Sequence, residues 1–142
     1  MEPADKVTVV RSMTEAFAQR DADAYLRHMT DDVVVRSTPY VAGEGEYHGH
    51  DAVRAGMDKT IRDFARTGKR LRIVDQACYL DGDDESKVCV LARITIQRVN
   101  GEEFGTDIAY VSTFEGDRIC RVEAWLDHAD GLAQLESPIR VA

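Results

Sequence analysis

The sequence is short of positive charge, has few cysteines and contains no long apolar run. Its 142 residues include 18 lysines and arginines against 26 aspartates and glutamates, which gives a net charge of −8. A surface of this sign repels phosphate backbones and anionic membrane surfaces, so we expect no nucleic-acid partner and no membrane partner. The chain does not open on a basic stretch followed by an apolar one, and we expect a cytoplasmic protein.

Further absences narrow the function. Cys78, Cys89 and Cys120 are an odd number with wide spacing, from which neither a disulfide framework nor a C-x-x-C metal site can be built. The sequence has no glycine-rich phosphate loop and no G-x-S-x-G nucleophile elbow. We therefore expect the cysteines to be small buried residues, and the length predicts a single domain over residues 1–142.

The first half of the chain has the hydrophobic periodicity of helices. Apolar residues recur every three or four positions near the N-terminus and over residues 53–64, which predicts amphipathic helices that end near Arg20 and Thr67. Asp21 can cap a short helix after the first of these. Residues 33–37 are a β-branched run, which predicts a short strand.

The second half of the chain has the alternation of strands. Residues 71–80, 87–99, 104–114 and 118–126 are four strand candidates, separated by D-G-D-D, N-G-E-E and E-G-D, which are typical of hairpin turns. Helices followed by a consecutive meander predict an α+β domain. In this fold class the N-terminal helices pack on one face of a curved, mostly antiparallel sheet.

Arg93 lies in the middle of an apolar run, where an unpaired charge is costly to bury. A two- or four-residue N-G-E-E loop places Arg93 beside Tyr110, whereas a three-residue loop places it opposite Asp107. A three-residue E-G-D loop puts Tyr110 on the same face as Ala124. A few polar groups on an apolar face are typical of a small-molecule pocket, and equally of a core with hydrogen-bonded polar residues.

The segment E-G-E-Y-H-G-H-D is a second candidate site. Glu44, Glu46, His48 and His50 alternate along it, so an extended segment could present four metal ligands on one side. Its glycines disfavour that extension, and His50 lies where the following helix needs capping groups. We therefore expect neither a metal nor a cofactor.

Four stretches of the chain together carry a resemblance. They are F-A-Q-R-D-A-D-A-Y at 17–25, M-T-D-D-V-V-V at 29–35, Y-H-G-H-D-A-V-R at 47–54 and F-E-G-D-R-I-C-R-V-E-A-W-L-D-H-A-D-G-L-A-Q-L at 114–135. In this order the chain resembles the nuclear transport factor 2 superfamily, in particular its SnoaL-like polyketide cyclase and ketosteroid isomerase branches. The resemblance implies a conical α+β barrel with a deep apolar pocket, usually a homodimer, often binding polyketides, steroids or terpenoids. It does not by itself imply an activity.

The carboxylates of the resembling enzymes are missing at the matching positions. SnoaL-like cyclases place an acid/base aspartate where this chain has Ala124. Ketosteroid isomerases place an oxyanion-hole tyrosine near Met13 and a protonated aspartate near Tyr110. Limonene epoxide hydrolases pair an arginine with an aspartate two residues later, and here Arg93 is followed at that spacing by Thr95.

Arg93 and Tyr110 remain as the candidate catalytic pair, because a tyrosine hydroxyl beside a cation can stabilise a carbonyl or enolate oxygen. His48, in the loop over the expected barrel mouth, could move a proton. We expect cofactor-free isomerisation, cyclisation or dehydration of a small apolar or polycyclic oxygenated molecule; the alternative is a non-catalytic ligand-binding or interaction domain, which Ala124 favours. The expected ligand-binding residues are Met13, Phe17, Tyr25, Tyr40, Tyr47, Leu91, Thr95, Ile108, Ser112, Val122, Ala124 and Leu126.

Overall fold

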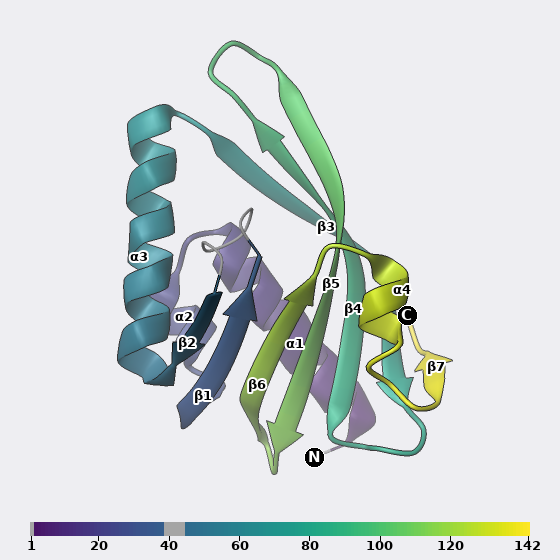
Figure 1. The fold of residues 1–142 in the computed structure, drawn as a ribbon. Helices are drawn as coiled ribbons and strands as arrows, with labels where there is room; N and C mark the ends of the chain where they lie inside the picture. Colours follow the sequence, from purple (N-terminus) through teal and green to yellow (C-terminus); the bar gives the residue numbers. More distant parts are fainter. Residues whose placement is uncertain (1, 39–44) are drawn as a thin grey trace.

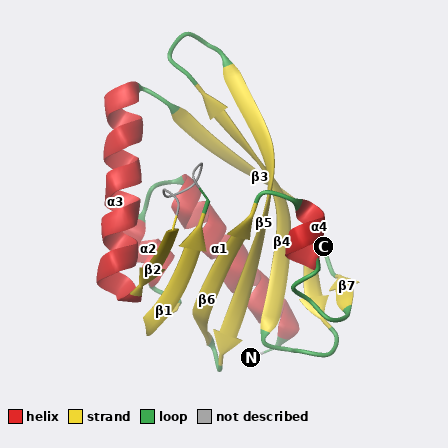
Figure 2. Ribbon diagram, viewed as in Figure 1, coloured by secondary structure: helices red, strands yellow, loops and turns green. Residues whose placement is uncertain are grey.

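A computed structural model describes residues 2–38 and 45–142 and confirms the α+β class, with helices packed on a single curled sheet (Figures 1 and 2). The helices are α1 (Pro3–Ala18), α2 (Ala22–Leu26), α3 (Gly49–Thr67) and α4 (His128–Leu132). The strands are β1 (Met29–Ser37), β2 (Gly45–His48), β3 (Arg70–Asp81), β4 (Lys87–Gln97), β5 (Glu103–Glu115), β6 (Arg118–Trp125) and β7 (Pro138–Arg140). The strand order is β2-β1-β6-β5-β4-β3-β7, so the sheet curls without closing into a barrel.

The predicted helix ends are confirmed by their caps. The carboxylate of Asp21 accepts a hydrogen bond from the backbone N–H of Ala24 at 3.1 Å, which starts α2. α3 ends where Gly68 takes the left-handed conformation with φ of 69°, which glycine adopts without steric cost. In the described part of the chain, no helix is long and apolar enough to cross a membrane.

Three elements and one strand pairing were not predicted from the sequence. The short elements β2, α4 and β7 lie outside the helices and strands that the sequence predicts. β1 pairs with β6 in the parallel direction, from Met29 opposite Ile119 to Arg36 opposite Glu123. This pairing brings the N-terminal helices and the meander onto one sheet, and no turn signal in the sequence indicates it.

The β4–β5 hairpin has the three-residue loop rather than the two- or four-residue loop. The backbone N–H of Arg98 donates to the carbonyl of Glu102 at 2.8 Å, so the loop is residues 99–101. Arg93 therefore pairs with Asp107, and Tyr110 pairs with Val90. The expected pairing of Arg93 with Tyr110 is wrong, because the register places the two side chains on opposite faces of the sheet.

The β5–β6 hairpin has a shorter turn than expected, and a bulge compensates for the difference. Its turn is two residues long, with Glu115 opposite Arg118, and Cys120 is then an extra residue in a β-bulge. The bulge shifts the register by one residue, so Tyr110 pairs with Ala124 and Ser112 with Val122. Tyr110 and Ala124 therefore share a face of the sheet, as predicted. A second bulge in β3, between Asp75 and Ala77, turns Asp75 toward the helices, opposite Ala92.

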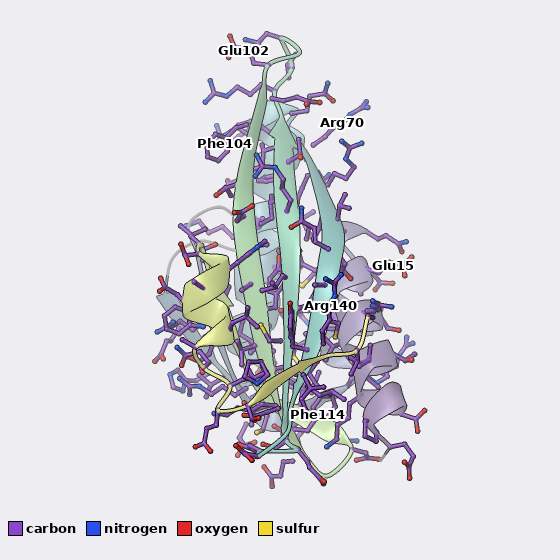
Figure 3. The ribbon with its side chains drawn as sticks, turned by 90° about the vertical axis from the view of Figure 1, so that its right-hand side faces the viewer. Glu15, Arg70, Glu102, Phe104, Phe114 and Arg140 are labelled. Carbon is purple, nitrogen blue, oxygen red and sulfur yellow. The ribbon has the colours of Figure 1, made fainter. Side chains whose placement is uncertain are left out.

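Beyond the helices, β3, β4 and β5 continue as a narrow three-stranded extension, seen at the top of Figure 1. Its strand segments are residues 70–75, 93–97 and 103–107. Glu102 lies at its tip, and Phe104 and Arg70 lie below the tip on opposite edges (Figure 3). In Figure 1, α3 lies to the left of the extension, and Gly68 at its C-terminal end lies against the side chain of Val99 in the β4–β5 loop.

Candidate functional site

An apolar cleft lies on the helix-covered face of the sheet, between the helices and strands β1, β5 and β6. Its empty volume is about 400 Å³, part of it open to solvent, and its enclosed part is narrow. Five of the residues predicted to bind ligand line this cleft together with Tyr110, which was predicted to be catalytic: Phe17, Tyr25, Tyr47, Val122 and Ala124. Met13 lines a second hollow that shares four of these side chains, so the two spaces are neighbours.

Tyr110 is the main polar group of the cleft. Its side chain is 7% exposed, and its hydroxyl has no hydrogen-bond partner among residues 2–38 and 45–142. Burial raises the pKa of Tyr110 far above the ordinary tyrosine value, and nearby Tyr25 and the negative charge of Asp75 add to the effect. The hydroxyl is therefore neutral at every physiological pH and can donate a hydrogen bond into an apolar space.

Tyr25 and Phe17 form the helical wall facing Tyr110. Their rings meet edge to face with centroids 5.5 Å apart, a favourable aromatic geometry. Burial also raises the pKa of Tyr25, so its hydroxyl is neutral as well. Two neutral phenols thus lie at one apolar space, which suits an uncharged ligand oxygen better than a free ion.

Two small residues set the width of the cleft. Ala124 lies directly opposite Tyr110 across the β5–β6 pair, so a methyl group stands where a larger side chain would fill the space. Gly56 of α3 lies against the ring of Tyr47: a Cβ on this glycine would come within 2.7 Å of the ring. Gly56 therefore allows Tyr47 to pack flat on α3 and form one wall.

Two of the three predicted catalytic residues lie away from the cleft. Arg93 is on the opposite face of the sheet, where it forms an ion pair with Asp107 at 3.1 Å, and both side chains are 49% exposed. His48 pairs with Val34 on that same outer side and is 68% exposed, 3.5 Å from Glu46. Successive side chains of a strand point to opposite faces of the sheet. The residues next to Arg93 and His48 in the sequence therefore face the helices, whereas Arg93 and His48 face outward.

Three predicted ligand-binding residues lie away from the cleft, and a fourth cannot be placed. Leu91 and Thr95 share the outer face with Arg93 because of the hairpin register, and Leu91 packs in a small core under α4. Leu126 follows the end of β6 and is 41% exposed. Tyr40 lies outside the described residues.

Ile108 and Ser112 are on the predicted face but deeper than the cleft. Both are fully buried, and the Ser112 hydroxyl has no partner within the described ranges. Ile108 and Ser112 are therefore part of the packed core and not part of a ligand pocket. The sheet face combines the two alternatives: a cleft around Tyr110 and a packed core below it.

The histidine-rich segment does not assemble a metal site in the residues described. His50 is directed away from its neighbours, with Nε2 3.1 Å from the carbonyl of Met29. No group of three histidine, cysteine or acidic side chains is placed to hold a metal within residues 2–38 and 45–142. Glu44 lies outside those ranges.

Sequence reasoning missed Asp75, a carboxylate on the helix-covered face. The side chain is exposed yet lies close enough to α1 to be partly desolvated; burial raises its pKa, and the charge of Arg11 opposes that shift. A signal was present: the apolar positions of β3 change from odd (Leu71) to even (Cys78) across Asp75-Gln76. Such a change of parity indicates a bulge.

Comparison with known proteins places the chain in a family. The model of the SnoaL-like domain matches residues 10–122. No curated protein matches the sequence. An NTF2-like protein of unknown function from Burkholderia pseudomallei has a TM-score of 0.69 and 26% identity, covering 96% of this chain and 100% of that one.

Two further solved structures share the fold and contain ligands. TerC, co-crystallised with polyporic acid, has a TM-score of 0.67 and 19% identity, covering 92% of this chain and 97% of that one. A Mycobacterium tuberculosis protein in complex with estradiol-17beta-hemisuccinate has a TM-score of 0.66 and 15% identity, covering 91% and 97%. Since the matching family model spans well over half of its length, the chain belongs to the SnoaL-like family.

Proposed function

We propose that this SnoaL-like protein binds an apolar, oxygen-bearing small molecule in the cleft, with the Tyr110 hydroxyl donating a hydrogen bond to a ligand oxygen. The observation that carries the proposal is the hydroxyl itself, which is buried at an apolar space and unpartnered among the described residues. A buried polar group without a protein partner is typical of a site that a ligand or water completes. The fold neighbours solved with polyporic acid and with estradiol-17beta-hemisuccinate support it.

The proposal is tested by calorimetric titration and thermal unfolding with a panel of quinones, polyketides, steroids and terpenoids. At least one class should bind and raise the Tm of the wild type. In Tyr110→Phe the affinity for that class should fall about threefold to tenfold, which is the worth of one hydrogen bond. The proposal fails if no class binds, or if Tyr110→Phe binds as tightly as the wild type.

A second candidate is cofactor-independent acid–base catalysis, such as isomerisation, cyclisation or dehydration. One observation favours it: Asp75 lies on the same face of the sheet as Tyr110. Burial raises the pKa of the Asp75 carboxyl, and the charge of Asp75 contributes to the raised pKa of Tyr110. A carboxyl with a raised pKa exchanges protons closer to neutral pH, as a general acid or base requires. Because Arg93 and His48 lie outside the cleft, neither is part of this mechanism.

Product analysis separates the two candidates. The ligands that bind are incubated with wild type, Asp75→Asn and Tyr110→Phe, and products are followed by mass spectrometry and NMR. Catalysis predicts a product with the wild type and at least about a hundredfold slower formation with Asp75→Asn, the usual effect of losing an acid or base. Saturating binding without any product supports a ligand-binding protein alone.

We also propose that the chain acts as one domain, in a cytoplasmic homodimer. The family resemblance supports the dimer, and the net charge of −8 is compatible with a freely diffusing protein. Sedimentation equilibrium of the purified protein tests the dimer: a single species of monomer mass across micromolar concentrations would contradict it.

A further inference from the structure

Arg20 has a backbone conformation that arginine rarely adopts. Its φ is +62°, and it is the one residue other than glycine with positive φ in the described ranges. It follows α1 in a Schellman motif, in which the N–H of Asp21 donates to the carbonyl of Ala16 at 2.9 Å. Glycine is preferred at this position because a side chain is strained there, and strain of this kind is concentrated at functional sites.

The guanidinium of Arg20 is partly buried and has no carboxylate partner. Its Cζ lies 5.4 Å from the centre of the Phe64 ring, and Nη2 donates a hydrogen bond to the carbonyl of Lys69 at 3.2 Å. No acidic side chain of the described residues lies within ion-pair distance of it. In the same ranges the arginines that do form ion pairs are Arg36, Arg54, Arg66, Arg93, Arg98 and Arg121.

Arg20 lines a narrow apolar hollow beside the cleft, whose empty volume of about 250 Å³ includes space open to solvent. Phe17 and Met57 border both spaces, so two side chains separate the Tyr110 cleft from the Arg20 hollow. A methionine changes rotamer at low cost and adapts to the shape of a bound molecule. A ligand that displaced Met57 would reach from Tyr110 past Phe17 to the guanidinium.

We infer that Arg20 binds the anionic end of the ligand, so that the ligand class is an elongated apolar carboxylate with an oxygen at its other end for Tyr110. This inference rests on the proposed function. A carboxylate completes the unpaired donors of the guanidinium with charge-assisted hydrogen bonds, which are about twice as strong as neutral ones. It also neutralises a cation that aromatic and aliphatic side chains partly remove from water.

The experiment uses a matched pair of fluorescent probes, 4-(pyren-1-yl)butyric acid and 4-(pyren-1-yl)butan-1-ol, which differ in the charged group. Their affinities are measured by fluorescence titration for wild type, Arg20→Gly and Arg72→Gln. Glycine suits the positive φ, so Arg20→Gly keeps the fold. Arg72→Gln removes one charge from an exposed position on the outer face of β3 and serves as the matched control.

The wild type and Arg72→Gln should bind the acid about tenfold more tightly than the alcohol, and Arg20→Gly should bind the two equally. The preference of the wild type should weaken in high salt. Equal binding of both probes by the wild type, or a preference for the acid that survives in Arg20→Gly, overturns the role of Arg20. If the role of Arg20 is overturned, or if neither probe binds the wild type, but Tyr110→Phe still weakens the binding of a ligand from the panel, the inference about Arg20 fails and the proposed function stands. If no ligand of the panel binds the wild type, both proposals are contradicted.

Discussion

Tyr110 and Ala124 face each other across the β5–β6 pair, and the methyl group of Ala124 leaves open the space that the tyrosine hydroxyl faces. SnoaL-like cyclases carry an acid at the position of Ala124. In this chain the small side chain at that position widens the cleft. The lining of the cleft combines the phenols of Tyr110 and Tyr25 with Arg36, Ser37, aromatic rings and aliphatic side chains. A mostly apolar lining with a few polar groups is suited to binding apolar molecules that carry an oxygen.

Filling this space should abolish binding. Ala124→Leu adds three carbon atoms at the centre of the cleft, and ligand affinity should fall more than about tenfold in fluorescence titration. Overpacking should also lower the free energy of unfolding by about 1–3 kcal/mol. Ala129→Leu, the same change on the exposed surface of α4, is the control and should leave affinity unchanged. Normal affinity in Ala124→Leu would place the ligand elsewhere.

Removing the Tyr110 hydroxyl should have opposite effects on stability and on binding. Because the hydroxyl is buried and unpartnered among the described residues, Tyr110→Phe deletes a desolvated polar group without breaking a hydrogen bond. The variant should unfold at the same temperature as the wild type or higher, by scanning calorimetry, while its ligand affinity falls. A clear loss of stability in the absence of ligand would show that the hydroxyl has a structural partner.

Arg93 should be dispensable. Its ion pair with Asp107 is half exposed on the outer face, and such pairs contribute about 0–1 kcal/mol. Arg93→Gln should leave ligand affinity and any turnover unchanged and alter the free energy of unfolding in urea by less than about 1 kcal/mol. Lost binding in this variant would restore the catalytic role that the sequence suggested for Arg93.

Asp81 should be the most sensitive carboxylate for folding. It is 3% exposed and accepts hydrogen bonds from the backbone N–H groups of Asp83, Glu136 and Ser137 at 2.9–3.0 Å, which hold the C-terminal segment to the β3–β4 turn. Burial opposes ionisation, but these hydrogen bonds outweigh it and lower the pKa of Asp81. Asp81→Asn should destabilise the protein by about 1–3 kcal/mol in urea at neutral pH.

The pH dependence of that loss follows from the lowered pKa. A carboxyl whose pKa is lower in the folded state adds stability above its unfolded pKa of about 3.9, and the added stability is lost as the pH falls through the folded-state value. The difference between wild type and Asp81→Asn should therefore shrink in acid. Asp83→Asn, at an exposed neighbour, should match the wild type throughout. A difference that stays constant with pH would contradict the role of the ionised form.

The sequence predicts elements far better than it predicts which residues meet. Periodicity and caps place the helices up to Asp21 and Gly68 correctly, since these signals are local. The face of Arg93 depends on one residue of loop length between β4 and β5, and N-G-E-E is compatible with several lengths. The E-G-D loop was predicted one residue too long, and only the bulge at Cys120 returned Tyr110 and Ala124 to a common face.

The residues of the candidate site were predicted only in part, because helical faces can be derived from the sequence and strand register cannot. Residues on helices, such as Phe17 and Tyr25, were placed correctly because helical faces follow from spacing alone. Arg20 and Asp75 were not identified, since one depends on a strained helix end and the other on a bulge. Both features become visible when the backbone is known.

The parallel pairing of β1 with β6 has a consequence for how the protein forms. Met29 meets Ile119, some 90 residues later in the chain, and no local hairpin can bring these strands together. Closing so long a loop before its contacts form is slow, and proteins rich in such contacts fold on the scale of milliseconds to seconds. During synthesis, the apolar faces of α1 and β1 therefore remain uncovered until β6 has been made. The cleft can form only after residues 118–125 have left the ribosome.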